Sequence, residues 1–390
     1  MKIYETECYQ RTLQTVVTYC EKVGEKILLQ LQDTIFFPEE GGQYADRGWL
    51  VYGEEQACVL DGHLKKGEIF YEVDREIPVG TEVECRLDWE LRFTRMQQHT
   101  GEHILTGVIH NTFGYDNVGF HLSDDSPVTL DMNGELTAEQ VQEMERLANE
   151  AVFADLPVQI TFPSKDELTQ MDYRSKIDIP GQVRIITVGE FDDPIDVCAC
   201  CAPHLSHTGE VGLIKVISAQ RYKGGVRIGI LCGRRALEHY RREWNRMNQI
   251  ARFFSGSPEQ IMDSLQSQKS EIAALRGELA ARKEAELMRR IEALPESTHA
   301  CLCLPELSSD GMKRGFNTMA EKFPGYVGVF VGDDASGYRY YAGSIARDSR
   351  ELAKIFREKL GAKGGGNADM IQGKAMVTAE QIREFFAALG

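Results

Sequence analysis

Residues 91–113 read LRFTRMQQHTGEHILTGVIHNTF. Apolar side chains recur in this stretch near helical spacing, which predicts a helix over about 91–113. His99 and His103 are four residues apart, so they share one face of that helix and could bind the same metal ion. The pair alone is weak evidence, because surface histidines at this spacing are common.

A second group of metal-binding side chains lies far downstream. Cys200 and His204 are in a predicted loop that leads to a strand, and they add a thiolate and a third imidazole. Three nitrogens and one sulfur form a tetrahedral zinc set. The sequence therefore predicts Zn²⁺ as a cofactor, bound by His99, His103, Cys200 and His204. Cys198 and Cys201 lie close enough in sequence that an exchange of the thiolate ligand stays open.

Length and composition limit the class of protein. The chain has 390 residues, 42% hydrophobic and 27% charged, which corresponds to two or three packed domains. Ten cysteines are too few for a disulfide scaffold of this size, so we expect a reducing, cytoplasmic location. The sequence contains no apolar run of about 18 residues or more and begins with acidic rather than apolar residues. We therefore expect no membrane partner.

The charge distribution is uneven. A net charge of −16 argues at first against a nucleic-acid partner, because phosphate contacts need clustered lysine and arginine. Residues 221–250 are nevertheless locally basic. Arg234, Arg235, Arg241 and Arg242 are candidates for contacts with nucleic-acid phosphates. A solvated helix face explains the same pattern equally well.

The pattern along the chain predicts an α+β fold in four segments. Residues 1–90 alternate short apolar runs with turns, which is typical of a β-barrel-like domain. Residues 91–250 combine helices, two of them opened by capping boxes at Thr137 and Ser164, with strands over 183–188, 212–217 and 226–231. Residues 251–292 form a helical connector. Residues 293–390 alternate strands, at 300–304, 326–331 and 338–341, with helices at about 308–322, 349–360 and 378–388, as in a small α/β domain.

The connector is predicted to be one long helix. Ser257, followed by proline and then by glutamine three residues on, is typical of a helix start. A coiled-coil-like seam follows at Ile261, Leu265, Ile272, Leu275 and Leu279, with Gln268 at one seam position. The seam either pairs with a second copy or packs on its own chain. A homodimer through the connector or the last domain is thus a hypothesis.

Four signals in a fixed order resemble the editing half of alanyl-tRNA synthetases. They are the segment TIFFPEEGGQYADRG at 34–48, the His-x-x-x-His helix, the Cys-x-x-x-His loop followed by TGEVG at 208–212, and KGGGNADMIQG at 363–373. The last is similar to the glycine-rich loop of the DHH-associated domain that ends these synthetases. The aminoacylation and tRNA-recognition domains have no counterpart here. The chain therefore resembles the free-standing, long-form AlaX proteins, and we expect no ATP-dependent activation.

The resemblance implies an activity and a set of site residues. It implies a zinc-dependent aminoacyl-tRNA deacylase that edits mischarged Ser-tRNA(Ala) in trans, with Gly-tRNA(Ala) as a second substrate in some members, and tRNA(Ala) as the partner through its acceptor end and body. It implies the same four zinc ligands. It places Gly41, Gly42, Gln43, Gly119 and His121 near the zinc as substrate-binding candidates, and Lys363, Gly364, Gly365 and Gly366 as tRNA-binding candidates.

Two alternatives stay open. Because four protein ligands fill a tetrahedron, the zinc either becomes five-coordinate during hydrolysis or mainly anchors the substrate while another group positions the water. The second alternative concerns the whole chain, which would be a non-catalytic tRNA- or RNA-binding protein with structural zinc. The two readings are distinguished by whether the turnover of mischarged tRNA correlates with the amount of bound zinc, as it should for the enzyme.

Overall fold

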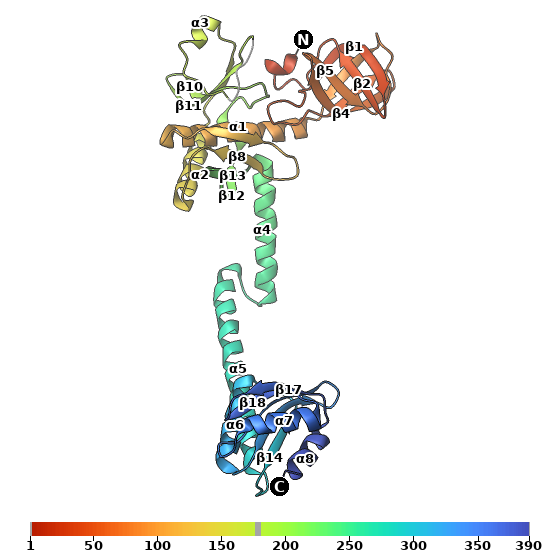
Figure 1. Ribbon diagram of the computed structural model, residues 1–390. Helices are drawn as coiled ribbons and strands as arrows, with labels where there is room; N and C mark the ends of the chain where they lie inside the picture. Colours follow the sequence, from red (N-terminus) through yellow and green to blue (C-terminus); the bar gives the residue numbers. More distant parts are fainter. Residues whose placement is uncertain (1, 176–180, 390) are drawn as a thin grey trace. The chain divides into compact units, whose positions relative to one another are not determined.

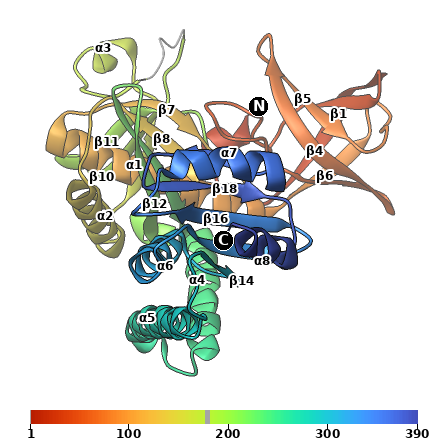
Figure 2. The same cartoon turned by 60° about the horizontal axis from the view of Figure 1, so that its bottom comes forward.

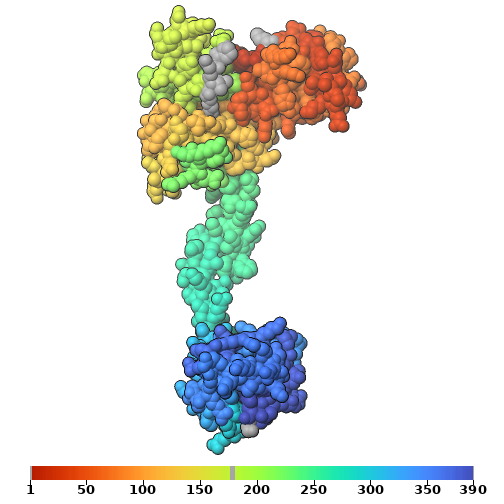
Figure 3. Space-filling model, in the orientation of Figure 1, coloured from red at the N-terminus to blue at the C-terminus, as the bar shows by residue number. Residues whose placement is uncertain are grey.

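The computed structural model describes residues 2–175 and 181–389. The chain divides into two compact units, Met1–Gln249 and Ile250–Gly390 (Figure 1). Each unit has its own hydrophobic core. The space-filling view shows the outer surface of the two units, coloured along the sequence (Figure 3). Within the described ranges, no helix combines the length and the apolar character that a membrane span requires.

Unit 1 begins with a closed, six-stranded antiparallel barrel in the order β1-β2-β5-β4-β3-β6 (Figure 2). A short 3₁₀ turn, η1 (Ile3–Glu5), precedes it. The strands are β1 (Thr12–Val23), β2 (Lys26–Leu31), β3 (Gly48–Tyr52), β4 (Glu55–Lys65), β5 (Glu68–Val73) and β6 (Glu82–Leu87). Alternate side chains such as Val17, Leu29 and Leu50 fill the interior. The predicted barrel is confirmed.

Helix α1 (Trp89–Phe113) is the centre of the rest of unit 1. The Asp88 carboxylate accepts a hydrogen bond from the Leu91 amide at its start, and Gly114, with φ 70°, ends it in the left-handed conformation. The predicted helix over 91–113 is confirmed and begins two residues earlier. It lies between two sheets and contacts both (Figure 1).

The two sheets surround α1 with strands from distant parts of the chain. One has the order β11-β10-β9 and the other the order β12-β13-β8-β7. Their strands are β7 (Asn117–His121), β8 (Val128–Met132), β9 (Val158–Thr161), β10 (Ile185–Glu190), β11 (Asp193–Ala199), β12 (Ile214–Tyr222) and β13 (Gly225–Cys232). The three predicted strands correspond to β10, β12 and β13. The bounds of β10 and β12 are shifted by two residues or more at each end, and β13 extends one residue beyond the prediction at each end. Helix α2 (Ala138–Phe153), helix α3 (Lys165–Leu168) and the 3₁₀ turn η2 (Thr208–Val211) complete this part. The capping boxes at Thr137 and Ser164 are confirmed.

Two glycines let the sheets approach α1 closely. A Cβ atom on Gly107 would lie 2.3 Å from the Ile195 carbonyl oxygen, and one on Gly101 would lie 2.4 Å from Cys232 Sγ. Both distances are far below van der Waals contact. The helix carrying the two histidines therefore needs glycine where each sheet meets it.

A buried ion pair fastens α1 to the barrel side of unit 1. Arg92 and Asp46 are 0% and 1% exposed and form a charge-assisted pair, with Arg92 Nε 2.9 Å from Asp46 Oδ2. The Arg92 guanidinium also donates to the carbonyl oxygens of Cys8 (2.9 Å) and Ile35 (2.6 Å). Asp46 Oδ2 accepts a hydrogen bond of 2.7 Å from the Phe37 amide. The pair thus joins the helix, the N-terminal turn and the loop that leads into β3.

Helix α4 (Gly233–Phe253) crosses the division between the units. Unit 2 continues with the 3₁₀ turn η3 (Pro258–Gln260) and helix α5 (Ile261–Glu292). The predicted capping box at Ser257 and the long helix after it are confirmed. Leu287 and Ile291, near the end of α5, are buried in the core of unit 2.

Unit 2 is a five-stranded sheet in the order β14-β15-β16-β18-β17, covered by helices on both faces (Figure 2). Its strands are β14 (Ala300–Leu304), β15 (Val327–Asp333), β16 (Gly337–Gly343), β17 (Lys363–Gly366) and β18 (Met370–Ala375), and its helices are α6 (Ser309–Lys322), α7 (Ser349–Leu360) and α8 (Ala379–Ala387). The predicted strands and helices are confirmed. Only β14 and β15 pair in parallel, so the sheet is mixed rather than of the regular α/β kind.

The glycine run of unit 2 differs from the prediction. Lys363–Gly366 is the edge strand β17 rather than a loop, and it pairs with β18 along its length. A Cβ on Gly364 would lie 2.2 Å from the Gln372 carbonyl oxygen and 2.8 Å from the Tyr340 hydroxyl. Glycine therefore permits a close strand-to-strand approach here, within a hairpin whose second strand begins four residues after β17 ends. The run does not look like a strand in the sequence, because glycine is depleted in strands.

Candidate metal centre

The four predicted ligands converge between α1 and the loop that follows β11. The ligand atoms of His99, His103, Cys200 and His204 all lie within 4.8 Å of one another, and the three imidazoles are at most 3% exposed. Cys200 Sγ is 3.5 Å from His99 Nε2 and 3.3 Å from His204 Nε2. A tetrahedral zinc with ordinary bond lengths separates sulfur and nitrogen ligands by about 3.5 Å. The arrangement therefore fits a zinc ion.

Each imidazole is held at its outer nitrogen by another polar side chain. Nδ1 of His99 lies 2.8 Å from Gln43 Oε1, Nδ1 of His103 lies 2.7 Å from Asp196 Oδ2, and Nδ1 of His204 lies 3.1 Å from Thr100 Oγ1. Such partners fix the ring orientation and leave Nε2 for a metal. A set of histidines oriented in this way is typical of a metal centre and uncommon for histidines buried for packing alone.

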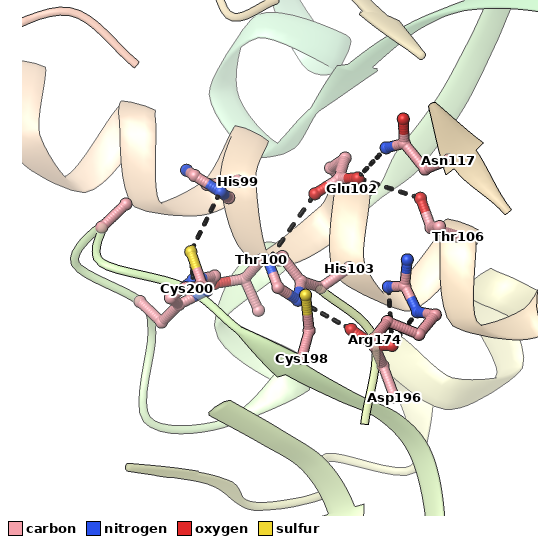
Figure 4. Close-up of polar contacts among 12 residues, drawn as sticks. His99, Thr100, Glu102, His103, Thr106, Asn117, Arg174, Asp196, Cys198 and Cys200 are labelled. Carbon is pink, nitrogen blue, oxygen red and sulfur yellow. Dashed lines mark hydrogen bonds and ion pairs between the residues drawn. The ribbon is translucent and has the colours of Figure 1, made fainter. Parts of the chain in front are cut away.

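Asp196 connects the centre to a second charge. Its other carboxylate oxygen accepts hydrogen bonds from Arg174, at 2.8 Å from Nε and 2.6 Å from Nη2 (Figure 4). Burial opposes protonation of His103, but its hydrogen bonds to Asp196 and Cys200 outweigh burial and raise its pKa to about 10. The His103 proton must leave when Nε2 binds a metal, so metal affinity should rise with pH.

The three neighbouring cysteines differ in ionisation. Burial raises the pKa of a thiol, but for Cys200 the facing imidazoles of His99 and His204 outweigh it and hold the pKa below its usual range. Burial raises the pKa of Cys198 and of Cys201, so both stay thiols. Because a metal binds the thiolate, Cys200 is the favoured ligand of the three. Cys198 does lie near His103 and Asp196 in a second cluster, where Asp196 already holds His103 Nδ1.

The loop at 41–43 lies against this centre. Gly41 and Gly42 have φ of 61° and 83°, which favours glycine, and a Cβ on Gly42 would lie 2.9 Å from the Phe120 carbonyl oxygen. Gln43 is fully buried and holds His99, while its Nε2 has no hydrogen-bond partner in the described part of the chain. Gln43 thus brings a free amide donor to the edge of the centre.

On β7, Phe120 is the residue whose ring packs on His99, with centroids 4.7 Å apart. Its neighbours Gly119 and His121 face the opposite side of the strand, because side chains alternate. His121 is exposed and its ring meets Tyr44 edge-on at 6.0 Å. The structure therefore brings Gln43 to the predicted ligands directly, whereas Gly119 and His121 flank the contacting residue.

Glu102 is a buried carboxylate beside the centre. It is 2% exposed and accepts hydrogen bonds from Thr106 Oγ1, at 3.0 Å, and from the Asn117 side-chain amide (Figure 4). Its second oxygen lies 3.7 Å from His103 Nε2. Glu102 therefore places a buried carboxylate next to His103, which makes this side of the centre polar.

The predicted arginines differ in their surroundings. Arg235 donates to the carbonyl oxygens of Ser123 (2.7 Å) and Ser126 (2.6 Å), and Arg234 pairs with Glu90 at 3.2 Å. Both line a cavity of about 640 Å³ at the start of α4, together with Arg242 and several acidic residues. Arg241 and Arg242 are exposed, and Lys363 to Gly366 are exposed along β17.

Helix α4 also carries an aromatic stack close in sequence to Arg241 and Arg242. The rings of Tyr240 and Trp244 are stacked at 13° with centroids 6.3 Å apart, and the residues are 60% and 47% exposed. Exposed aromatic faces next to arginine are typical of surfaces that bind single-stranded nucleic acid. Sequence analysis considered the charge of this helix and missed its aromatic residues.

Comparison with known proteins shows which family model part of the chain matches. Residues 183–228 match the family model described as the threonyl and alanyl tRNA synthetase second additional domain. This range contains Cys200 and His204, two of the four converging side chains.

Whole-chain relatives extend the likeness. The chain is 27% identical to alanyl-tRNA editing protein AlaX-L of Pyrococcus horikoshii, over 98% of this chain and 96% of that protein. It is 25% identical to alanyl-tRNA editing protein Aarsd1-B of Xenopus laevis, over 95% and 93%. It is 32% identical to the alanine–tRNA ligase of Caldivirga maquilingensis over 90% of this chain, and spans 40% of that ligase. The chain resembles the long-form alanyl-tRNA editing proteins along nearly its whole length, as the sequence motifs predicted.

Proposed function

We propose that this chain is an alanyl-tRNA editing enzyme that hydrolyses the ester of mischarged Ser-tRNA(Ala), with Gly-tRNA(Ala) as a second candidate substrate. The buried set of three imidazoles and one thiolate, each imidazole oriented by its own polar partner, carries the proposal. The resemblance to editing proteins over nearly the whole chain supports the substrate class. His99, His103, Cys200 and His204 would hold the zinc ion.

In this proposal the chain's own residues bind the amino-acid part of the substrate and select serine over alanine. A zinc ion held here would polarise the ester carbonyl and lower the pKa of a nearby water. The unpaired Nε2 donor of Gln43 and the Glu102 carboxylate, whose Oε2 is 3.7 Å from His103 Nε2, are our candidates for hydrogen bonds to the amino-acid part of the substrate. When alanine enters in place of serine, a polar group that pairs with the serine hydroxyl is left unpaired. Sites of this kind discriminate by about 10⁴-fold or more.

The direct test is the rate of hydrolysis of Ser-tRNA(Ala), Gly-tRNA(Ala) and Ala-tRNA(Ala) by the purified chain. We expect fast release of serine and slow release of alanine, because correct Ala-tRNA(Ala) lacks the hydroxyl. His103→Ala and a chelator-treated sample serve as controls and should both be inactive. Zinc-loaded protein that binds tRNA(Ala) yet hydrolyses none of the three would favour the RNA-binding alternative.

We propose further that tRNA contacts two exposed basic surfaces. One is on α4, where Arg241 and Arg242 lie in the sequence between the stacked residues Tyr240 and Trp244. The other is the edge strand β17, where Lys363 adds charge next to three exposed glycines. Arg234 and Arg235 are less available for phosphate contacts, because Arg234 pairs with Glu90 and Arg235 donates to two backbone carbonyl oxygens.

The double variant Arg241→Glu/Arg242→Glu should weaken tRNA binding in a salt-dependent way. In a plot of the logarithm of the tRNA association constant against the logarithm of the salt concentration, each lost phosphate contact should reduce the slope by about one. The matched control is Lys65→Glu/Lys66→Glu, an equal charge change at two exposed residues, the last of β4 and the first of the turn before β5. Equal losses of affinity for both variants would mean that net charge alone acts, and would contradict the assignment to α4.

A further inference from the structure

Arg184 is a buried arginine whose hydrogen bonds join two distant segments of unit 1. It immediately precedes β10 and is 7% exposed. Its Nε lies 2.8 Å from the Glu5 carbonyl oxygen, and its Nη1 lies 2.8 Å and 2.9 Å from the carbonyl oxygens of Cys200 and Ala202. A longer contact of 3.8 Å joins its Nη2 to Cys8 Sγ. One guanidinium therefore binds both the N-terminal turn and the loop that carries Cys200.

The acceptors of Arg184 differ from those of comparable side chains. Among the described residues of unit 1, Arg92 and Arg95 are also buried, and each forms an ion pair with an aspartate. The described contacts of Arg184 include no carboxylate. A buried guanidinium is costly unless its donors are used, and here backbone carbonyl oxygens use them. The planar set of donors is thus matched to the shape of the loop rather than to a counter-charge.

The loop leaves β11 at the point where Arg184 binds it. Ile185 of β10 pairs with Ala199, the last residue of β11. One residue further along, the Cys200 amide donates to the Arg184 carbonyl oxygen at 3.1 Å. Both the amide and the carbonyl group of Cys200 therefore bind Arg184, which fixes the backbone that carries the thiolate.

Thr100 of α1 holds the other end of the loop. Its Oγ1 accepts a hydrogen bond of 3.1 Å from the Leu205 amide and lies 3.1 Å from His204 Nδ1. Between the two ends, Ala202 is fully buried in a small apolar cluster with Tyr4. The loop that carries two of the four proposed ligands is thus fixed at both ends.

We propose that Arg184 is a positioning residue that sets the conformation of the loop 200–204 for metal binding. The inference rests on the proposed function, because this loop supplies two of the zinc ligands assigned there. A lysine at this position would keep the positive charge but would lack the rigid fork of a guanidinium. The Cys200 thiolate would then no longer be held at a fixed distance from the imidazoles.

Cobalt(II) is the probe for the metal-bound full chain, because its thiolate-to-metal charge-transfer band reports on the thiolate ligand alone. In Arg184→Lys we expect this band to weaken. We also expect zinc affinity, measured by competition with a chelating dye, to fall roughly 10- to 100-fold. The matched control is Arg92→Lys, which replaces a second buried arginine that also donates to the N-terminal segment, at the Cys8 carbonyl oxygen. Its cobalt spectrum and zinc affinity should equal those of the unaltered chain.

Alkylation of the full chain after chelation separates a local effect from general unfolding. Cys201 lies in the loop, whereas Cys232 is fully buried at the end of β13. In Arg184→Lys, iodoacetamide should modify Cys201 roughly tenfold faster than in the unaltered chain, because the loop opens locally. The rate at Cys232 should stay unchanged. Equal acceleration at both cysteines would mean that Arg184 supports the whole unit, and would overturn the proposal.

The metal measurements distinguish this inference from the proposed function. An unchanged cobalt spectrum in Arg184→Lys, with metal bound to the unaltered chain, would overturn the role of Arg184 alone. An equally weakened band in Arg92→Lys would also overturn it, because the effect would then follow from a loosened fold. An unaltered chain that binds neither zinc nor cobalt would overturn the proposed metal centre and this inference with it.

Discussion

Replacing Asp46 by alanine should destabilise unit 1 by about 3–5 kcal/mol, because it leaves the buried Arg92 guanidinium without a counter-charge. The substitution also removes the acceptor of the Phe37 amide. The remaining acceptors of Arg92, the carbonyl oxygens of Cys8 and Ile35, carry only partial charge. Urea unfolding followed by tryptophan fluorescence measures the effect. All three tryptophans, Trp49, Trp89 and Trp244, lie in unit 1, so the signal reports on that unit.

The control for this measurement is Glu84→Ala in the same barrel. Glu84 pairs with Arg86, but that ion pair is exposed, and exposed pairs contribute about 0–1 kcal/mol. We expect the midpoint of unfolding to move little for Glu84→Ala and far for Asp46→Ala. Similar small shifts for both variants would mean that water or another group reaches Arg92, contrary to its burial.

Replacing Cys200 by alanine should remove bound zinc and reduce hydrolysis of Ser-tRNA(Ala) by more than about 100-fold, because the thiolate is the one anionic ligand of the proposed set. Zinc per chain, measured by plasma mass spectrometry, and single-turnover deacylation should fall together. Full deacylation without zinc would contradict a metal-dependent mechanism. Stoichiometric zinc with lost deacylation would mean that the thiolate acts on the substrate beyond holding the metal.

Three further variants test which side chains bind the zinc directly and which only surround it. Cys198→Ala and Cys201→Ala should keep zinc, because burial holds both side chains as thiols. Loss of zinc in Cys198→Ala would instead assign the metal to the cluster of His103, Asp196 and Cys198. Asp196→Asn should retain the four ligands but lower zinc affinity by about 10–100-fold, because the carboxylate orients His103.

Local signals explain what could be predicted from the sequence. The capping boxes at Thr137, Ser164 and Ser257 lie within four residues of the helices they start, and all three appear in the structure. The four converging side chains could be named because two of them share a helical spacing and the other two a short loop. The alternation of residues 1–90 indicated a barrel, but not its strand order.

What could not be predicted depends on contacts between distant residues. No local pattern marks Asp196, in the middle of β11, as the partner of His103, or Arg174 as the partner of Asp196. The same holds for Thr100, which looks like an ordinary helical residue until His204 is placed beside it. The glycines of β17 look like a turn for a different reason, because glycine is depleted in strands, although the pairing strand β18 follows directly.

The contacts around Asp46 also limit how evolution can transfer the metal centre from one protein to another. Asp46 binds Arg92, Gln43 binds His99, and the Ala45 carbonyl oxygen accepts from Arg95, so one short loop meets three successive turns of α1. A gene rearrangement that joined the helix to a different N-terminal partner would transfer the histidines while losing the groups that neutralise and orient this helix. Recombination could therefore move the metal centre between larger proteins only as one segment that contains both the barrel and α1.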